Sequence, residues 1–230
     1  MYCGILEQAG RSVVGQKILN FGYGGNFALA CGLLQAGASQ ITLVDKFAPP
    51  DNHFNRKLLP VYEKYLTVQD GLVTPRPEYI DLVEADIHEM AEQSQPPLFD
   101  IVLSSSVYEH LNSVDQITRS LAVLTKPTGC QVHFIDLRDH YFKFPFEMLT
   151  FSDETWEKWL NPGSNLNRLR TKDYRSIFEG YFRQVDIGVL ERDLVGFQRV
   201  QDRILPKYLT GDAQIDAITL LQVYAEQPYR

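Results

Sequence analysis

The sequence predicts an α/β fold, in which helices cover both faces of a doubly wound, mostly parallel sheet of seven strands. Two observations favour this fold. Short apolar runs alternate with stretches of helical periodicity along most of the chain. Three glycines, Gly22, Gly24 and Gly25, stand between the first apolar run and the first helical stretch. Such a strand–turn–helix–strand unit is typical of parallel sheets, whose crossovers are right-handed. One Rossmann-like domain therefore accounts for residues 1–230.

The first half of the chain supplies four of the expected strands, each a short apolar run. Residues 51–71 begin with an Asp/Asn cap, and we expect them to form a helix that Pro60 interrupts. The expected strands are residues 16–21, 40–45, 78–86 and 99–106, and the expected helices beside them are residues 26–37, 87–93 and 111–124.

The second half loses the regular alternation after residue 136. Residues 137–170 are dense in aromatic side chains and show no strand of their own, so we expect an insertion or lid over the substrate. These aromatic residues favour core packing or packing between subunits, which is consistent with a homodimer. Around this segment we expect a turn at 126–129, strands at 130–136, 182–193 and 215–227, a helix at 171–181, and a short helix in the last connection.

The composition excludes several classes of function. Acidic residues outnumber basic ones, 29 against 22, and no Lys/Arg-rich segment offsets the net charge of −7, so nucleic-acid binding is disfavoured. No apolar run reaches the roughly 18 residues that a membrane-spanning helix needs, and residues 1–15 lack a secretion-signal pattern. Cys3, Cys31 and Cys130 form no Cys-x-x-Cys pair, so neither disulfides nor a thiolate zinc site are expected. We expect a cytoplasmic protein that binds neither nucleic acid nor membrane.

The glycine-rich loop at residues 22–25 points to a nucleotide-like ligand. Gly22 and Gly24 permit a tight turn and close approach of a ligand to the backbone, and the helix that follows presents its N–H groups. Asp45 ends the second strand about twenty residues on, where a carboxylate accepts hydrogen bonds from ribose hydroxyls. The NAD fingerprint G-x-G-x-x-G requires a glycine where Phe27 stands. A nucleoside with an attached tail is therefore favoured, and a nicotinamide-dependent oxidoreductase is the weaker alternative.

Four motifs together resemble those of the class I S-adenosylmethionine-dependent methyltransferases. They are "NFGYGGN" at the first strand, "LVDKF" at the second, "EADIHE" at the third and "FDIVLSSSVYEHL" at the fourth. The resemblance runs from about Gln16 to Gln227 and implies S-adenosylmethionine as the cofactor and an antiparallel seventh strand. Asn20 replaces the acidic residue that ends strand one in most members, and Asn26 replaces the third glycine.

The resemblance also implies which residues hold the cofactor. Gly22 and Gly24 would lie against its methionine part, Asp45 would hold the ribose, and Asp86 with Ile87 would face the adenine. The whole implied set is Asn20, Gly22, Gly24, Asn26, Asp45, Lys46, Asp86, Ile87 and Ser104.

The methyl acceptor is indicated by motifs that the chain lacks. The Asn/Asp-Pro-Pro-aromatic turn of amino-methylating nucleic-acid enzymes is absent, as are the Pro-Cys nucleophile of cytosine methylation and the paired-glutamate loop of protein arginine methyltransferases. Together with the acidic charge, this favours a methyltransferase that acts on a small molecule. The main alternative is a binding or scaffolding module that keeps the fold without catalysis, and it is motivated by Asn20 and Asn26.

Histidines after the fourth and fifth strands are the candidates for a catalytic base, because the ordinary pKa of histidine lies nearest neutral pH. We expect His140 to take the proton of the acceptor, with His110 as second choice and Tyr108 as a positioning group. Asp136 and Asp139 would orient His140 or raise its pKa. The cluster "DLRDH" could instead hold a divalent cation, but it supplies ligands from one local segment only, so no metal is favoured. The residues expected to bind substrate are Asp136, Arg138, Asn167 and Arg168.

Overall fold

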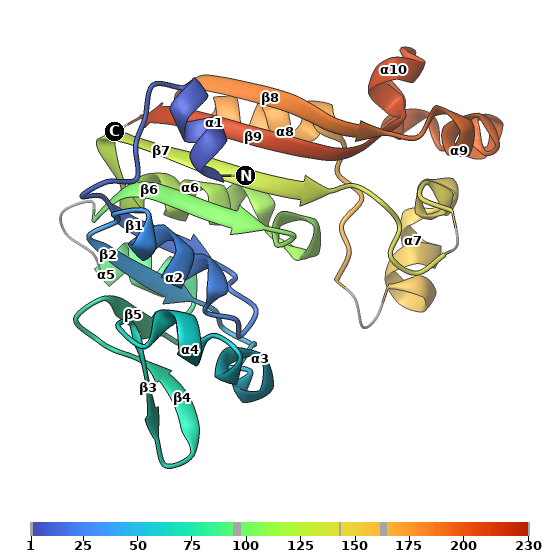
Figure 1. Cartoon of the computed structure of the whole chain (residues 1–230). Helices are drawn as coiled ribbons and strands as arrows, with labels where there is room; N and C mark the ends of the chain where they lie inside the picture. The colour runs from blue at the N-terminus through green and yellow to red at the C-terminus, as the bar shows by residue number, and fades with distance from the viewer. Residues whose placement is uncertain (1, 94–97, 143, 162–164, 230) are drawn as a thin grey trace. The chain divides into compact units, whose positions relative to one another are not determined.

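The computed structural model describes residues 2–93, 98–142, 144–161 and 165–229, and within them seven strands form one sheet in the order β5-β2-β1-β6-β7-β9-β8 (Figure 1). The sheet is mostly parallel, its last strand is antiparallel and helices cover both faces, which confirms the predicted fold class. Its strands are β1 (Lys17–Phe21), β2 (Gln40–Val44), β5 (Ile80–Val83), β6 (Phe99–Ser105), β7 (Thr125–Asp136), β8 (Phe182–Arg192) and β9 (Ile218–Pro228).

Helices and short helical turns connect these strands. The α-helices are α1 (Tyr2–Gln8), α2 (Ala28–Gln35), α3 (Asn52–Arg56), α4 (Leu59–Tyr62), α5 (Ile87–Gln93), α6 (Val114–Leu124), α7 (Asp153–Thr155), α8 (Thr171–Glu179), α9 (Leu194–Gln198) and α10 (Ala213–Asp216). The shorter turns are η1 (Tyr108–His110), η2 (Glu147–Thr150), η3 (Trp156–Leu160), η4 (Gln201–Arg203) and η5 (Pro206–Tyr208).

The chain divides into two compact units. Of the described residues, unit 1 takes those within 1–104, 120–132 and 227–230, and unit 2 takes those within 105–119 and 133–226. Unit 1 therefore carries the glycine loop and the ends of β2 and β5. Unit 2 carries the loop after β6, the carboxyl end of β7, and β8 and most of β9.

Parallel pairing in unit 1 places the ends of its strands at one edge of the sheet. β1 pairs with β2 and with β6, so that Asn20 lies opposite Leu43 and Leu103. Ile18 and Leu19 are fully buried, as expected for a parallel strand covered on both faces. The strand order changes direction between β1 and β6, and the crevice at such a switch point is where open parallel sheets bind ligands.

The segment 51–71 differs from its prediction. Only α3 and α4 are helical, and the chain then forms an antiparallel hairpin of β3 (Leu66–Gln69) and β4 (Leu72–Pro75), which projects from unit 1 in Figure 1. Asp70 and Gly71 form its turn with φ of 51° and 78°. Asp-Gly between alternating apolar residues is the sequence signal for a two-residue hairpin turn, and the helical prediction overlooked it.

The predicted turn at residues 126–129 falls inside β7, which begins at Thr125. An added Cβ at Gly129 would lie 2.8 Å from the carbonyl oxygen of Asp100 in β6 and 3.1 Å from that of Lys126. The glycine therefore packs closely both against β6 and against the chain three residues before it. Lys126 pairs with the same Asp100 at 2.7 Å between Nζ and Oδ1.

Two helix starts were not expected. The sequence showed no helix at residues 2–8, yet α1 forms there, and the Tyr2 hydroxyl donates to the carbonyl oxygen of Ser104 at 2.7 Å. Helix α2 begins at Ala28 rather than at residue 26, because the Asn26 side chain accepts a hydrogen bond from the Ala28 N–H at 2.8 Å.

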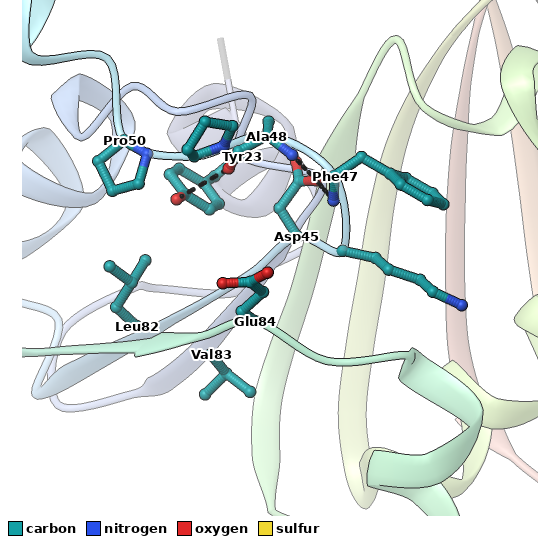
Figure 2. Close-up of a pocket in the computed structure, with 10 residues that line it drawn as sticks. Tyr23, Asp45, Phe47, Ala48, Pro50, Leu82, Val83 and Glu84 are labelled. Atoms are coloured by element: carbon teal, nitrogen blue, oxygen red, sulfur yellow. Dashed lines mark hydrogen bonds between the residues drawn. The ribbon is translucent and has the colours of Figure 1, made fainter.

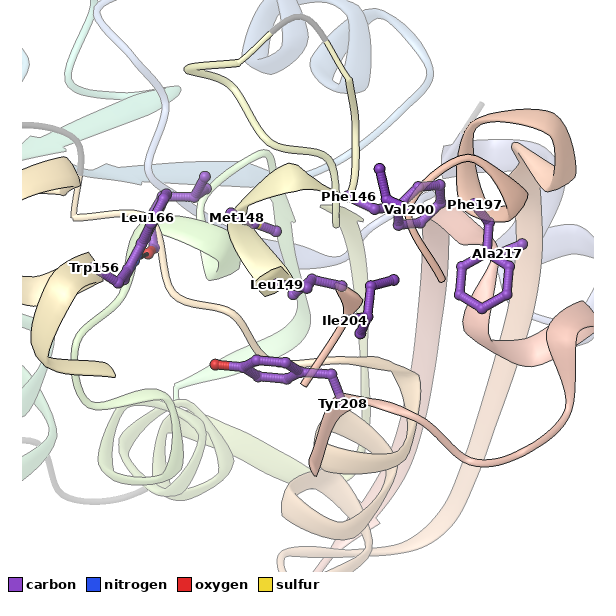
Figure 3. Close-up of a cluster of buried hydrophobic side chains, with 10 residues drawn as sticks. All are labelled: Phe146, Met148, Leu149, Trp156, Leu166, Phe197, Val200, Ile204, Tyr208 and Ala217. Carbon is purple, nitrogen blue, oxygen red and sulfur yellow. Dashed lines mark hydrogen bonds between the residues drawn. The ribbon is translucent and has the colours of Figure 1, made fainter. Parts of the chain in front are cut away.

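The segment 137–170 contains no strand among its described residues, as expected, and part of it packs into the core of unit 2 (Figure 3). Its aromatic residues differ in burial. Phe146 and Trp156 are buried, whereas Tyr141 and Trp159 are exposed. The expected role of the segment as a lid remains a prediction. The buried cluster that joins it to the chain after β8 is Phe146, Met148, Leu149, Trp156, Leu166, Phe197, Val200, Ile204, Tyr208 and Ala217.

Candidate functional site

The glycine loop of unit 1 leaves β1 with three glycines at positive φ, namely 72° at Gly22, 62° at Gly24 and 78° at Gly25. This region costs other residues about 1–2 kcal/mol. At Gly25 the loop is tightly packed, since an added Cβ would lie 2.5 Å from the carbonyl oxygen of Pro49. At Gly24 an added Cβ would meet no atom within 4 Å. The fold therefore requires Gly25, while Gly24 borders open space.

A buried asparagine that the sequence did not single out holds this loop. The Asn55 amide donates to the carbonyl oxygen of Gly25 at 2.8 Å, and its Oδ1 accepts from the Phe27 N–H at 3.0 Å. The Asp51 N–H donates to the same carbonyl oxygen at 2.8 Å. Nothing in the local sequence marks Asn55, because its partners lie in a loop that precedes it by a whole strand.

Asp45 connects the loop after β2 to the glycine loop. Its Oδ1 accepts hydrogen bonds from the N–H groups of Phe47 and Ala48, both at 2.9 Å, and its Oδ2 accepts one from the Gly24 N–H at 3.1 Å. A carboxylate offers about four lone-pair sites, so Asp45 retains acceptor capacity for a hydroxyl of a ligand.

A cavity of ≈ 280 Å³ opens beside Asp45 (Figure 2). The Tyr23 hydroxyl donates to the Ala48 carbonyl oxygen at 3.2 Å at its edge. Burial raises the pKa of Tyr23, and the charges of Asp45 and Glu84 add to this effect. The volume is below the roughly 300–1,000 Å³ of complete ligand pockets, so it fits a part of a nucleoside-sized ligand. The lining residues are Tyr23, Asp45, Lys46, Phe47, Ala48, Pro49, Pro50, Leu82, Val83 and Glu84.

Of the residues expected to hold the cofactor, only Asp45 and Lys46 are among the residues that line this cavity. The Lys46 ammonium pairs with Asp86 at 2.9 Å between Nζ and Oδ2. The hydrogen bond from Lys46 lowers the pKa of Asp86, so this carboxylate is charged at neutral pH. Ile87 is buried directly after Asp86, and Asn20 and Ser104 are buried near the ends of β1 and β6.

In unit 2, the end of β7 carries a polar cluster around Asp136. Arg138 donates to both carboxylate oxygens of Asp136, with Nε–Oδ1 at 2.9 Å and Nη2–Oδ2 at 2.6 Å. His140 Nε2 lies 3.6 Å from Asp136 Oδ2, and the rings of His140 and His110 have centroids 5.2 Å apart. Burial alone would raise the pKa of Asp136, but the hydrogen bonds from Arg138 hold it below its ordinary value. Unit 2 thus brings the two expected catalytic histidines together beside a charged carboxylate.

Tyr108 lies in the core of unit 2. It is fully buried, and its ring packs against His133 and Phe178 at centroid distances of 4.7 and 5.3 Å. Its hydroxyl accepts a hydrogen bond from Thr118 Oγ1 at 3.4 Å. Burial raises the pKa of Tyr108, so its hydroxyl remains protonated. These contacts anchor the loop after β6, and the expected role of Tyr108 in positioning the substrate is still a prediction.

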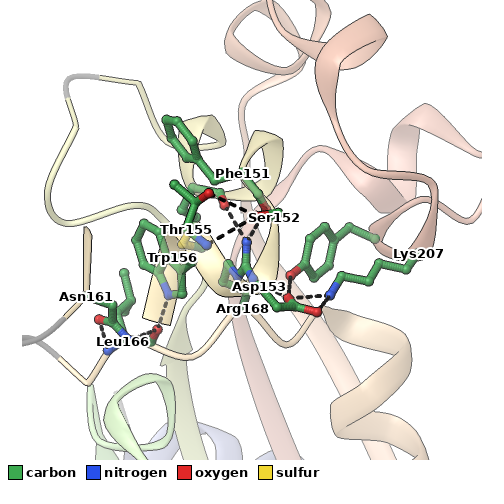
Figure 4. Close-up of polar contacts among 11 residues, drawn as sticks. Phe151, Ser152, Asp153, Thr155, Trp156, Asn161, Leu166, Arg168 and Lys207 are labelled. Carbon is green, nitrogen blue, oxygen red and sulfur yellow. Dashed lines mark hydrogen bonds and ion pairs between the residues drawn. The ribbon is translucent and has the colours of Figure 1, made fainter. Parts of the chain in front are cut away.

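Asn167 and Arg168, expected to bind substrate, make many contacts within unit 2. The Asn167 amide donates to the carbonyl oxygens of Tyr108 and Leu111 at 2.7 and 3.1 Å, which secures the loop after β6. Arg168 bonds to backbone carbonyls and to Asp153, as Figure 4 shows. These contacts give both side chains a structural role within unit 2. Their expected contact with a substrate remains a prediction.

Among the described residues, no group of three or more His, Cys, Asp or Glu side chains is arranged to hold a metal ion. The same part of the chain contains no helix that is both long and apolar enough to cross a membrane.

Solved structures with a similar fold include methyltransferases. One is an S-adenosylmethionine-dependent methyltransferase from Mesorhizobium loti, with a TM-score of 0.55, 14% identity, and coverage of 96% of this chain and 95% of that chain. Another is phosphoethanolamine N-methyltransferase 2 from Haemonchus contortus in complex with S-adenosyl-L-methionine, with a TM-score of 0.58, 16% identity, and coverage of 98% and 52%. The chain has the class I methyltransferase fold.

The class I methyltransferase fold does not by itself fix the reaction. A third similar structure is the [4+2]-cyclase SpnF, with a TM-score of 0.55, 14% identity, and coverage of 99% of this chain and 81% of that chain. No family model and no curated protein matches the chain. At such low identity the likeness shows the fold alone, and the chemistry has to be argued from the site.

The sequence places Glu109 with Tyr108 and His110 among the candidates for chemistry in the loop after β6, but assigns it no specific role. Glu109 is 1% exposed, and neither of its carboxylate oxygens has a hydrogen-bond partner among the described residues. Burial raises the pKa of Glu109 to about 7, and the charge of Asp136 adds to this effect. A local motif does not show the burial of Glu109, which involves segments far apart in sequence: its backbone carbonyl accepts a hydrogen bond from the Asn167 N–H at 2.7 Å.

Proposed function

We propose that the chain binds S-adenosylmethionine through unit 1 and transfers its methyl group to a small-molecule acceptor bound by residues of unit 2. The observation that carries this proposal is the glycine loop that Asp45 holds at the ends of β1 and β2. Two of the similar structures are named as methyltransferases, and one of them contains this cofactor.

The residues of unit 1 fit such a cofactor. The open space at Gly24 admits a ligand against the backbone, and Asp45 retains acceptor sites for ribose hydroxyls next to the cavity of Figure 2. When bound, S-adenosylmethionine supplies a methyl group on a positively charged sulfur, which keeps the electron pair of the broken bond. The protein must orient the acceptor and remove its proton.

In this proposal His140 takes the proton of the acceptor. Its Nε2 faces Asp136, so the proton would enter at Nδ1 and the carboxylate of Asp136 would stabilise the imidazolium that forms. The bonds from Arg138 hold Asp136 charged and fixed in orientation. His110, whose ring lies beside that of His140, is the second candidate for the base.

Calorimetric titration tests the cofactor. We expect S-adenosylmethionine and its demethylated product each to bind with one site per chain, and NADH not to bind. Binding of NADH instead would favour an oxidoreductase. Failure of both sulfur compounds to bind would contradict the proposal and favour the non-catalytic module suggested by Asn20 and Asn26.

Release of the demethylated product tests the base once an acceptor is found. General-base catalysis contributes about 10²- to 10⁴-fold, so we expect His140→Ala to lower turnover by at least a hundredfold while cofactor binding is unchanged. His53→Ala, at an exposed position of unit 1, is the matched control and should keep full turnover. A loss below about tenfold in both His140→Ala and His110→Ala would place the base elsewhere.

A further inference from the structure

A polar pocket of ≈ 410 Å³ lies within unit 2, next to the residues that follow β7. Its walls come from three segments that are distant in sequence: the chain after β7, the end of β8 with the start of α9, and the beginning of β9. The lining residues are Asp136, Arg138, Asp139, His140, Pro145, Glu191, Asp193 and Thr219.

Two of these lining residues each carry a buried polar atom that lacks a partner among the described residues. Asp139 is 7% exposed, and its Oδ1 accepts from the N–H groups of Tyr141 and Phe142 at 2.8 and 3.0 Å. Its Oδ2 is buried and has no hydrogen-bond partner among the described residues, and the same is true of Oγ1 of the fully buried Thr219. Leaving a buried polar group unpaired costs about 1–3 kcal/mol, and more when it is charged. A ligand that donates hydrogen bonds to both atoms would remove this cost.

The charge of the pocket indicates what kind of donor fits. Four carboxylates line it, against the guanidinium of Arg138 and the ring of His140. Arg138 is engaged by Asp136 and lies 4.0 Å from Glu191. No cation among the described residues pairs with Asp139. The pocket therefore carries an excess of negative charge, centred on a carboxylate whose free oxygen is already desolvated.

An organic ammonium group accounts for these features. It carries one positive charge and three N–H donors, which can reach a carboxylate and a hydroxyl oxygen together.

We propose that this pocket binds an ammonium group of the small-molecule acceptor, with Asp139 Oδ2 and Thr219 Oγ1 as its hydrogen-bond acceptors. That the bound molecule is the methyl acceptor rests on the proposed methyltransferase function. That the pocket binds an ammonium group does not. The ammonium is here a recognition group, which leaves open which atom receives the methyl group.

The test uses two probes that differ in one group, 3-amino-1,2-propanediol and glycerol, titrated into the full chain and followed by the probes' own NMR signals. A charge-assisted hydrogen bond to a buried carboxylate predicts at least about tenfold tighter binding of the aminodiol. Equal binding of the two probes, or binding of neither, would overturn the proposal.

Two variants locate the effect. Asp139→Asn keeps an oxygen for the N–H groups of Tyr141 and Phe142 but removes the charge, and it should abolish the preference for the aminodiol. Asp202→Asn removes one charge at an exposed site outside the pocket and should keep the preference. If Asp139→Asn still prefers the aminodiol, the assignment of Asp139 is wrong.

Titration of Asp139→Asn with S-adenosylmethionine separates the two proposals. Unchanged cofactor affinity together with a lost preference for the aminodiol supports both. Binding of the aminodiol by a wild-type chain that does not bind S-adenosylmethionine would leave the ammonium pocket in place and remove the methyltransferase function.

Discussion

The two units differ in how far the carboxylates near their candidate sites are satisfied by hydrogen bonds. Asp45 in unit 1 accepts three backbone N–H hydrogen bonds, and the Asn55 side chain forms hydrogen bonds with the backbone of Gly25 and Phe27. In unit 2, Glu109 has two unpaired oxygens and Asp139 has one. Of the five buried side-chain atoms that lack a partner among the described residues, four belong to unit 2.

This difference separates a scaffold from a site that is incomplete without a ligand. The backbone of unit 1 fixes its own loop in advance, which lowers the cost of ordering it when a ligand binds. Unit 2 leaves desolvated carboxylates that a ligand or a proton must satisfy. Substitutions at Gly25, Glu109 and Asp45 test this comparison.

The largest effect is expected in the preformed loop. Gly25→Ala places a Cβ 2.5 Å from the Pro49 carbonyl oxygen at a φ of 78°, so both a steric clash and backbone strain arise. We expect a loss of at least about 3 kcal/mol in the free energy of unfolding, measured by urea denaturation. Gly24→Ala also has an unfavourable positive φ, 62°, but open space around its Cβ, and it should lose only about 1 kcal/mol. Similar losses in both variants would show that the packing at Gly25 is not rigid.

The raised pKa of Glu109 makes the free energy of unfolding depend on pH. Its pKa is about 7 in the folded chain, against an ordinary 4.5, so the folded state binds the proton more tightly. Its contribution to stability is therefore fully present below pH 4.5 and is lost as the pH rises through 7. Glu109→Gln mimics the protonated form, and at pH 8 it should raise the free energy of unfolding by on the order of 3 kcal/mol relative to wild type, with little difference at pH 4.

Urea denaturation of both proteins at the two pH values measures this difference. The buried His133, whose pKa burial lowers to about 3, titrates in both proteins and cancels from the comparison. A variant that is no more stable than wild type at pH 8 would mean that Glu109 has partners in solution, and unit 2 would then resemble unit 1.

A smaller effect on stability than at Gly25 or Glu109 is expected at Asp45. Asp45→Ala removes three acceptor contacts and should lower the free energy of unfolding by about 2 kcal/mol. Asp45→Asn keeps the oxygen that serves Phe47 and Ala48 and should lose less. If Asp45 also holds a ribose, both variants should bind S-adenosylmethionine at least about tenfold more weakly by calorimetry. Wild-type affinity in Asp45→Asn would limit Asp45 to a structural role.

The sequence by itself determined where the main strands lie along the chain and where the glycine loop lies between them. Periodicity identifies a buried parallel strand, and glycines that need positive φ, such as Gly22 and Gly24, leave a local signal. The same local signal exists for the hairpin turn at Asp70 and Gly71, but the Asp/Asn cap at the start of this segment favoured a helix instead.

Only the tertiary structure decided which polar groups are satisfied. Asp139 lies in the loop after β7, Thr219 lies in β9, and Asn55 reaches back to the loop at Gly25, so their environments depend on contacts between segments far apart in sequence. Burial sets the pKa of Glu109 and the unpaired state of Asp139, and burial is a property of the assembled unit rather than of any motif.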